Sequence, residues 1–242
     1  MPTSKTEDQH SGRSRVTPTF RWLRDHGGAQ WVAELLNLAD GISAPAKTGR
    51  LVSLEVGEER EVPASAARLA WMIRNAHKLA PLDGRKWRRY LDSVILNPRR
   101  DETLQKLDAG ITHGIPAKLI LEGRTHADCL IETESALVWI EGKRNDWLSS
   151  GTTWDLARDQ LARNLEAAWI LASAAVKDWW LLICHEHDLK HHEEHLIAGY
   201  RQGSWSAGLP HLPVDVREAF RPKIGTLRWG RIFEKWPGIR TG

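Results

Sequence analysis

The segment from residue 125 to residue 143 holds carboxylates and a lysine at a spacing that can bind a metal ion and activate water. It reads THADCLIETESALVWIEGK. Asp128 precedes a short apolar run, a polar break follows, and a second apolar run leads into Glu141-Gly142-Lys143. Side chains alternate along a strand, so Glu141 and Lys143 are expected on one face. The pattern predicts a β-hairpin that carries a Mg²⁺-dependent phosphodiesterase site.

The expected register of this hairpin brings two acids together. If the turn is centred between Glu134 and Ser135, Asp128 lies opposite Glu141, with Cβ atoms about 5 Å apart. Both carboxylates can then bind one hard cation, Mg²⁺ or Mn²⁺, through oxygen. A four-residue loop is expected, because Glu134-Ser135 is not a favoured two-residue turn. The other face then carries apolar side chains that suit a core, namely those of Cys129, Ile131, Val138 and Ile140.

Lys143 suits a role beside the cation. An ammonium group next to a bound water or a scissile phosphate stabilises developing negative charge. The alternative interpretation is an ordinary hairpin with a surface ion pair, which contributes little to stability. A similar triplet, Asp188-Leu189-Lys190, lacks an acid inside a preceding paired strand. The first triplet is therefore preferred as the site.

These residues resemble the motif of the PD-(D/E)xK nuclease superfamily, which has the restriction-endonuclease-like fold. Asp128 matches the first motif acid, although Ala127 replaces the usual proline, and Glu141 with Lys143 matches the (D/E)xK pair. The resemblance covers about residues 115 to 185. It implies an α/β fold with a mixed sheet flanked by helices. It also implies metal-dependent hydrolysis of phosphodiester bonds in DNA, by an endonuclease or an exonuclease.

The neighbouring sequence fits the order strand, strand, helix, strand of the superfamily core. Apolar residues recur at helical spacing from Leu161 to Val176, after a capped helix start predicted at residues 152–155. Residues 179–184 predict a buried strand, and residues 118–122 (KLILE) predict the first core strand. The hairpin and the predicted helix are therefore expected to meet at one site.

The resemblance implies further site residues. Gln160 is the kind of residue that some members place after the lysine, as a catalytic group. Here the pattern is Gln160-x-x-x-Asn164, whereas the RecB-like branch has Gln-x-x-x-Tyr. Glu122 and Glu102 are candidates for an additional metal ligand. The alternatives are an exposed helical side chain for Gln160, a strand-end ion pair for Glu122 and a helix N-terminal charge for Glu102.

The chain has 242 residues, with 34 lysines and arginines against 31 acids, so it is not a generally basic protein. We predict a disordered tail over residues 1–18 and a mainly helical N-terminal region over 19–110. The nuclease-like core is expected over 111–205. Residues 206–242 form a basic segment that contains tryptophan.

Two basic clusters predict contacts with DNA. Residues 215–242 hold seven lysines and arginines against three acids, interleaved with Trp229 and Trp236. The second cluster surrounds Trp87 and consists of Arg85, Lys86, Arg88 and Arg89. Solvated helix faces are the alternative. DNA is the expected partner, and a homodimer is compatible with the resemblance. The alternative function is a catalytically silent member that binds nucleic acid or serves in assembly.

A histidine-rich stretch, HEHDLKHHEEH at residues 185–195, leaves three interpretations open. His191-His192-Glu193-Glu194-His195 fits H-x-x-E-H, a zinc-peptidase signature, but that site needs a glutamate ligand well downstream. On a helix, His191 and His195 share one face, as the ligands of a structural zinc or nickel site do. The third interpretation is a solvated turn, with His185 and His187 near the nuclease cleft.

Cys129 and Cys184 lie in apolar runs and are expected to be buried core thiols, not a disulfide. No apolar run approaches 18 residues and no signal peptide is visible. We therefore predict a cytoplasmic protein without a membrane partner.

Overall fold

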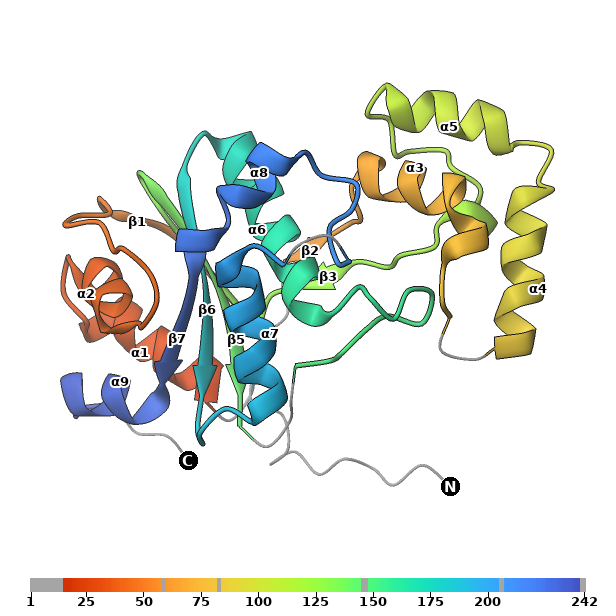
Figure 1. Ribbon diagram of the computed structural model, residues 1–242. Coiled ribbons are helices and arrows are strands. Elements are labelled where there is room, and N and C mark those ends of the chain that lie inside the picture. The colour runs from red at the N-terminus through yellow and green to blue at the C-terminus, as the bar shows by residue number, and fades with distance from the viewer. Residues whose placement is uncertain (1–14, 58–59, 82–83, 145–147, 205–206, 240–242) are drawn as a thin grey trace.

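The computed structural model describes residues 15–57, 60–81, 84–144, 148–204 and 207–239, which form a mixed α/β protein around a five-stranded sheet (Figure 1). Across the sheet the strands are β1 (Leu51–Val56), β4 (Cys129–Thr133), β5 (Ala136–Lys143), β6 (Asp178–His185) and β7 (Ile224–Arg228). β4 is antiparallel to β1 and β5, whereas β5, β6 and β7 run parallel. The predicted α/β class, with a mixed sheet flanked by helices, is confirmed.

The hairpin of β4 and β5 has the predicted register. Cys129 pairs with Ile140, and Ile131 pairs with Val138. These four side chains lie in one buried apolar cluster, on the face opposite to Trp139. A shift by one residue would move this apolar set to the other face, so burial fixes the register.

The hairpin loop has the predicted length and centre. The last pair between β4 and β5 is Glu132 with Leu137, so the four residues 133–136 connect the paired parts of the hairpin, as expected. The turn is stabilised by a distant segment, because the backbone N–H groups of Glu134 and Ser135 donate to the carbonyls of Arg50 and Thr48. The hydroxyl of Thr133 also accepts from the N–H that follows the turn.

The edge strand beside β4 is β1 and not the predicted segment 118–122. Residues 117–119 form a 3₁₀ turn after Pro116, and the chain then continues without regular structure to residue 124. The apolar side chains of Leu119 and Leu121 pack in a separate helical cluster and do not face the sheet. The prediction was wrong because a short apolar run fits both environments.

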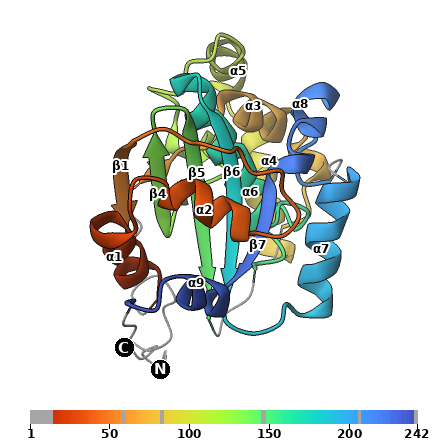
Figure 2. The ribbon, with the colours of Figure 1, turned by 90° about the vertical axis from the view of Figure 1, so that its left-hand side faces the viewer.

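Helices cover both faces of the sheet (Figure 2). On one face lie α6 (Gln160–Ala175) and α7 (His191–Gln202), with α8 (Val214–Glu218) at its end. On the other lie α1 (Thr17–His26), α2 (Trp31–Leu38) and α9 (Trp229–Lys235). The helix predicted to start at residues 152–155 begins instead at Gln160. Asp159 caps it by accepting the N–H of Ala162 at 2.7 Å.

A helical unit stands at one side of the sheet (Figure 1). It consists of α3 (Ala66–Arg74), α4 (Gly84–Ile95) and α5 (Arg100–Asp108), with the 3₁₀ turn Ala76–Lys78 between the first two helices. Its members share their own apolar cluster, which includes Ile73, Leu91 and Leu107. The small sheet of β2 (Glu61–Val62) and β3 (Thr125–His126) adjoins this unit.

The predicted segment boundaries change accordingly. Region 19–110 divides, because α1, α2 and β1 belong to the sheet layers and only residues 66–108 form the helical unit. Of the predicted tail, residues 1–14 lie outside the described residues, whereas α1 begins at Thr17. Cys129 and Cys184 are buried and do not form a disulfide, as predicted. In the described part of the chain, no helix has the length and apolar character needed to cross a membrane.

The C-terminal segment is part of the fold and not an appendage. Residues 224–228 form the fifth strand, 3₁₀ turn η5 (Arg221–Lys223) leads into it, and Trp229 is fully buried against Phe20. We expect deletion of residues 215–242 to abolish cooperative unfolding, because it removes a sheet strand and several buried side chains. Circular dichroism during heating measures this. A truncated chain that keeps a sharp thermal transition would contradict it.

Candidate active site

Glu141 and Lys143 lie at the carboxyl end of β5, on the face that α6 covers. The Lys143 Nζ atom is 2.9 Å from Glu141 Oε1, and the two residues are only 7% and 4% exposed. An ion pair at such depth needs further hydrogen bonds to offset the loss of hydration. The first two turns of α6 provide them.

Gln160 connects to both charged groups. Its Nε2 donates to Glu141 Oε1 at 2.7 Å, while its Oε1 accepts from Lys143 Nζ and from the backbone N–H of Ser149, each at 3.2 Å. One turn later, Asn164 Nδ2 donates to Glu141 Oε2 at 2.7 Å. The structure thus brings together three of the predicted site residues, Glu141, Lys143 and Gln160. It adds Asn164, which stands four residues after Gln160 on the same helix face.

Asp128 directly precedes β4 and does not form the predicted cross-strand pair with Glu141. β4 begins at Cys129, and Asp128 Oδ2 instead accepts the backbone N–H of Gly142 at 2.8 Å. A Cβ atom on Gly142 would lie 3.6 Å from this oxygen and 2.4 Å from Val16 Cγ2. The Asp128 carboxylate therefore lies toward the face that α1 covers. Burial raises the pKa of the nearby Cys184 thiol, and the charge of Asp128 raises it further.

The donor set fits a hard divalent cation. Glu141 Oε1 already accepts from Lys143 and Gln160, whereas Oε2 accepts from Asn164 and keeps a second lone pair. Within the described residues, no three His, Cys, Asp or Glu side chains converge as a metal-binding group. Mg²⁺ is commonly bound by one or two carboxylates together with waters and substrate phosphates. Glu141 offers one such carboxylate. Asp128, whose carboxylate lies toward the other face of β5, is a second carboxylate at this end of the strand.

A shallow pocket opens beside Lys143, where β5 and β6 end. The space between its lining side chains, open solvent included, is about 220 Å³, and the lining consists of Lys143, Arg144, His185, Glu186, His187, Asp188, Leu189 and Glu193. Lys143 and His185 are register partners on the parallel strands. The His185 Nδ1 atom lies 2.7 Å from the carbonyl oxygen of His187, which can only accept. The neutral ring therefore has its proton on Nδ1 and presents Nε2 as an acceptor.

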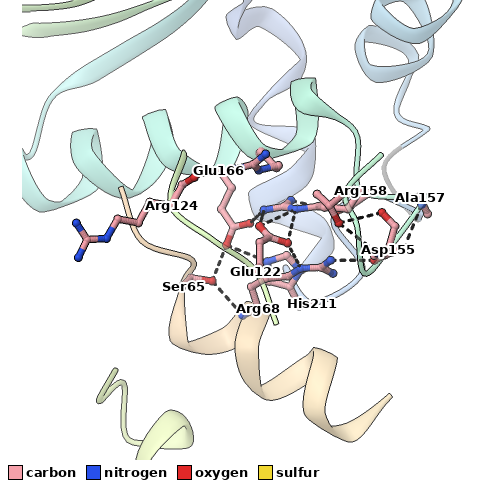
Figure 3. Close-up of polar contacts among 12 residues, drawn as sticks. Ser65, Arg68, Glu122, Arg124, Asp155, Ala157, Arg158, Glu166 and His211 are labelled. Atoms are coloured by element: carbon pink, nitrogen blue, oxygen red, sulfur yellow. Dashed lines mark hydrogen bonds and ion pairs between the residues drawn. The ribbon is translucent and has the colours of Figure 1, made fainter. Parts of the chain in front are cut away.

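Glu122, predicted as a metal ligand, lies outside this site. It is 4% exposed and accepts from Arg68 at 2.9 Å and from Arg158 at 3.0 Å. Figure 3 shows both arginines directed at its carboxylate. Because two cations already satisfy it, Glu122 does not supply a ligand. Glu102 is exposed on α5, where it pairs with Lys106 and Arg99, so it too is remote from the hairpin.

The arginines belong to a buried ionic network that connects α3 to α6 (Figure 3). Arg68 also binds Asp155 at 2.8 Å, and Arg158 also binds Glu166 at 2.5 Å. His211 Nε2 lies 3.0 Å from Glu166 and Ser65 donates to the same carboxylate. The network contains two arginines and three carboxylates, so its formal charge is −1 while His211 is neutral.

The electrostatics of the network favour ionised carboxylates. Burial works against the charged form of Glu166, but Arg158 and His211 outweigh this and lower its pKa to about 2. Glu122 follows the same pattern, since Arg158 and Arg68 lower its pKa against burial. Burial lowers the pKa of His211, only partly opposed by Glu166, which keeps the imidazole neutral.

The C-terminal basic residues are largely engaged with acids. Arg221 pairs with Glu218, Lys223 with Asp178, Arg228 with Asp188, Arg231 with Asp40 and Lys235 with Glu34. The predicted DNA-binding role of this segment therefore loses its main support. In the second cluster, Arg88 donates to the carbonyls of His77 and Leu79. Arg85 and Arg89 are exposed on α4.

Two contributors to the site have only weak signals in the sequence. Asn164 lies one turn after Gln160, where the RecB-like pattern has a tyrosine, so that pattern does not indicate an amide at this position. His185 follows an apolar run, and its place beside Lys143 depends on the parallel pairing of β5 with β6. No family model, curated protein or solved structure matches the chain.

Proposed function

We propose that this protein is a metal-dependent nuclease of the restriction-endonuclease-like fold that hydrolyses phosphodiester bonds in DNA. The observation that carries the proposal is the contact set of Glu141, Lys143 and Gln160, in which one side-chain amide connects an anion to a cation. Residues far from each other in sequence meet here at the end of a strand. A surface ion pair would not need this buried, fully hydrogen-bonded arrangement.

The order of elements supports the same conclusion. An antiparallel hairpin, β4 with β5, is followed by helix α6 and then by β6, which is parallel to β5. This is the strand, strand, helix, strand order of the PD-(D/E)xK core. The proposal is supported by the place of Glu141 and Lys143 on the hairpin and of Gln160 on the helix. The helical unit of α3–α5 is an addition at the side of this core.

The residues have distinct roles in the proposed reaction. Asp128 and Glu141 would hold the divalent cation, which when bound acidifies water and offsets phosphate charge. Lys143 positions an ammonium beside the reacting phosphate and stabilises the charge that develops in the transition state. Gln160 fixes the Lys143 and Glu141 side chains relative to each other, and Asn164 holds the second oxygen of Glu141. Such preorganisation reduces the reorganisation needed during the reaction.

DNA as the substrate is supported by the charge on the helical unit. Arg85 and Arg89 are one turn apart on α4, and neither has an acidic partner among the described side chains. Exposed arginines at this spacing suit contacts with successive phosphates. Trp87, between them, packs against Trp154 with ring centroids 4.4 Å apart, so it anchors the helix and does not stack on bases.

The proposal is tested by cleavage of supercoiled plasmid and single-stranded DNA with Mg²⁺, with Mn²⁺ and with a chelator. We expect metal-dependent cleavage that Glu141→Gln abolishes, because the variant keeps the shape of the side chain but loses the anion. Glu132→Gln is the matched control, since Glu132 lies on the same hairpin and is paired with Lys177 away from the site. Absence of cleavage with retained DNA binding would instead identify a catalytically silent binding protein.

A further inference from the structure

A second group of metal-binding side chains lies on α7, outside the candidate active site. His191 and His195 are one helical turn apart and both are exposed. Their Nε2 atoms are 3.0 Å apart, and their ring centroids are separated by 4.1 Å with the planes at 77°. The two Nε2 atoms are therefore close enough to contact one cation on the exposed side of the helix.

The close approach of the two Nε2 atoms has two chemical explanations. Two bare lone pairs repel each other, and two imidazolium rings would repel more strongly. Either one ring donates a proton to the other, or a cation lies between them. Two nitrogen ligands at about 2.1 Å from one ion and at right angles are about 3.0 Å apart, whereas a tetrahedral ion needs about 3.4 Å. The observed spacing fits two adjacent positions on a tetragonal or octahedral ion.

We propose that His191 and His195 form an open binding site for a first-row transition-metal ion, with Cu²⁺ or Ni²⁺ preferred over Zn²⁺. Imidazole nitrogens suit these ions, and the right-angle geometry is the one that Cu²⁺ and Ni²⁺ favour. In the described part of the chain no third His, Cys, Asp or Glu completes a closed group. Water would therefore fill the remaining positions, which distinguishes the site from a buried structural zinc site.

The helix itself supports two-point binding. α7 continues to Gln202, and Glu193 fixes its first turn by accepting the backbone N–H groups of Leu148 at 2.9 Å and Lys190 at 3.1 Å. The two histidines are therefore held on a rigid scaffold before the metal binds. Glu194 adds a negative charge to the same turn, which offsets the unfavourable effect of the positive end of the helix dipole on a nearby cation. A preorganised second ligand raises affinity because it binds at a high effective concentration.

The site differs chemically from the candidate active site. Asp128 and Glu141 offer oxygen to a hard cation, whereas His191 and His195 offer nitrogen to a borderline one. Mg²⁺ should therefore not compete for the histidine pair. His192 provides a matched control, because it lies in the same turn but about 100° around the helix from His191.

The experiment is calorimetric titration of the full chain, free of any affinity tag, with NiCl₂ and with CuCl₂ at pH 7.5 and in excess Mg²⁺. We expect one ion per chain, with affinity lowered by roughly 10²-fold in His191→Ala and in His195→Ala and unchanged in His192→Ala. Equal loss in His192→Ala, retention in the His195 variant, or displacement by Mg²⁺ would overturn the proposal. None of these outcomes depends on whether the protein cleaves DNA.

Discussion

Replacing Lys143 by alanine is expected to abolish cleavage of plasmid DNA while leaving the fold and the binding of Mn²⁺ largely intact. The ammonium lies 2.9 Å from Glu141 and lines the pocket at the end of β5. Loss of one such charge from a transition state often costs about 3 kcal/mol, or more than roughly 10²-fold in rate. Mn²⁺ affinity can even rise, since a positive charge beside the metal ligands is removed. Nicking rate and Mn²⁺ affinity measure the two effects separately.

The hairpin offers a matched control for this variant. Lys177 pairs with Glu132 near the opposite end of the hairpin, so Lys177→Ala removes a similar ion pair without touching the pocket. We expect normal cleavage at a slightly lower melting temperature. Asp128→Ala should lose both Mn²⁺ binding and cleavage, because it removes an anionic ligand. Cleavage at the wild-type rate by Lys143→Ala would mean that the active site lies elsewhere.

Arg158→Ala is expected to destabilise the protein by about 3–5 kcal/mol, because it leaves Glu122 and Glu166 buried without their shared cation. For a chain of this length the melting temperature should fall by roughly 6–20 °C. Arg74→Ala is the control, since Arg74 binds Asp108 through an exposed pair that is worth less than about 1 kcal/mol. Urea denaturation monitored by tryptophan fluorescence measures both variants. Equal effects would show that burial adds nothing to this ion pair.

The pH dependence of the unfolding free energy of Arg158→Ala distinguishes the loss of a charge from the loss of packing. Glu166 has a folded-state pKa of about 2 against a usual value of 4.5, so its contribution is present above about pH 4.5 and is lost as pH falls toward 2. The difference in unfolding free energy between the wild type and Arg158→Ala should therefore shrink over that interval. A difference that stays constant from pH 7 to pH 3 would indicate a packing effect instead.

Structural features that depend on the local sequence pattern could be predicted from the sequence. The register of β4 with β5 follows from alternation, because only one alignment buries Cys129, Ile131, Val138 and Ile140 together. Strand β6 follows from its continuous apolar run, as expected for a strand covered on both faces. Glu141, Lys143 and Gln160 could be selected as candidate site residues, because metal-dependent hydrolysis requires particular residue types as well as a particular spacing.

The features that distant partners decide could not be predicted. Glu122 resembles a site carboxylate until Arg68 of α3 and Arg158, which lies two residues before α6, are brought against it. The contacts of the hairpin loop with the backbone carbonyls of Thr48 and Arg50 could not be read from the local sequence either. The C-terminal charges resembled a patch because their acidic partners, such as Asp40 and Asp178, lie far away in the sequence.

The late position of β7 in the chain has a consequence for biosynthesis. β6 carries the run Trp179 to Cys184 and becomes an interior strand only when residues 224–228 pair with it. While the ribosome is still adding those residues, the emerging polypeptide exposes a long apolar strand edge that can pair with other chains. Helix α7 is translated before β7. It covers part of β6 through Ile197 and Tyr200, which pack in the same apolar cluster. Slow completion or premature termination near the C-terminus would therefore favour inclusion bodies over soluble protein.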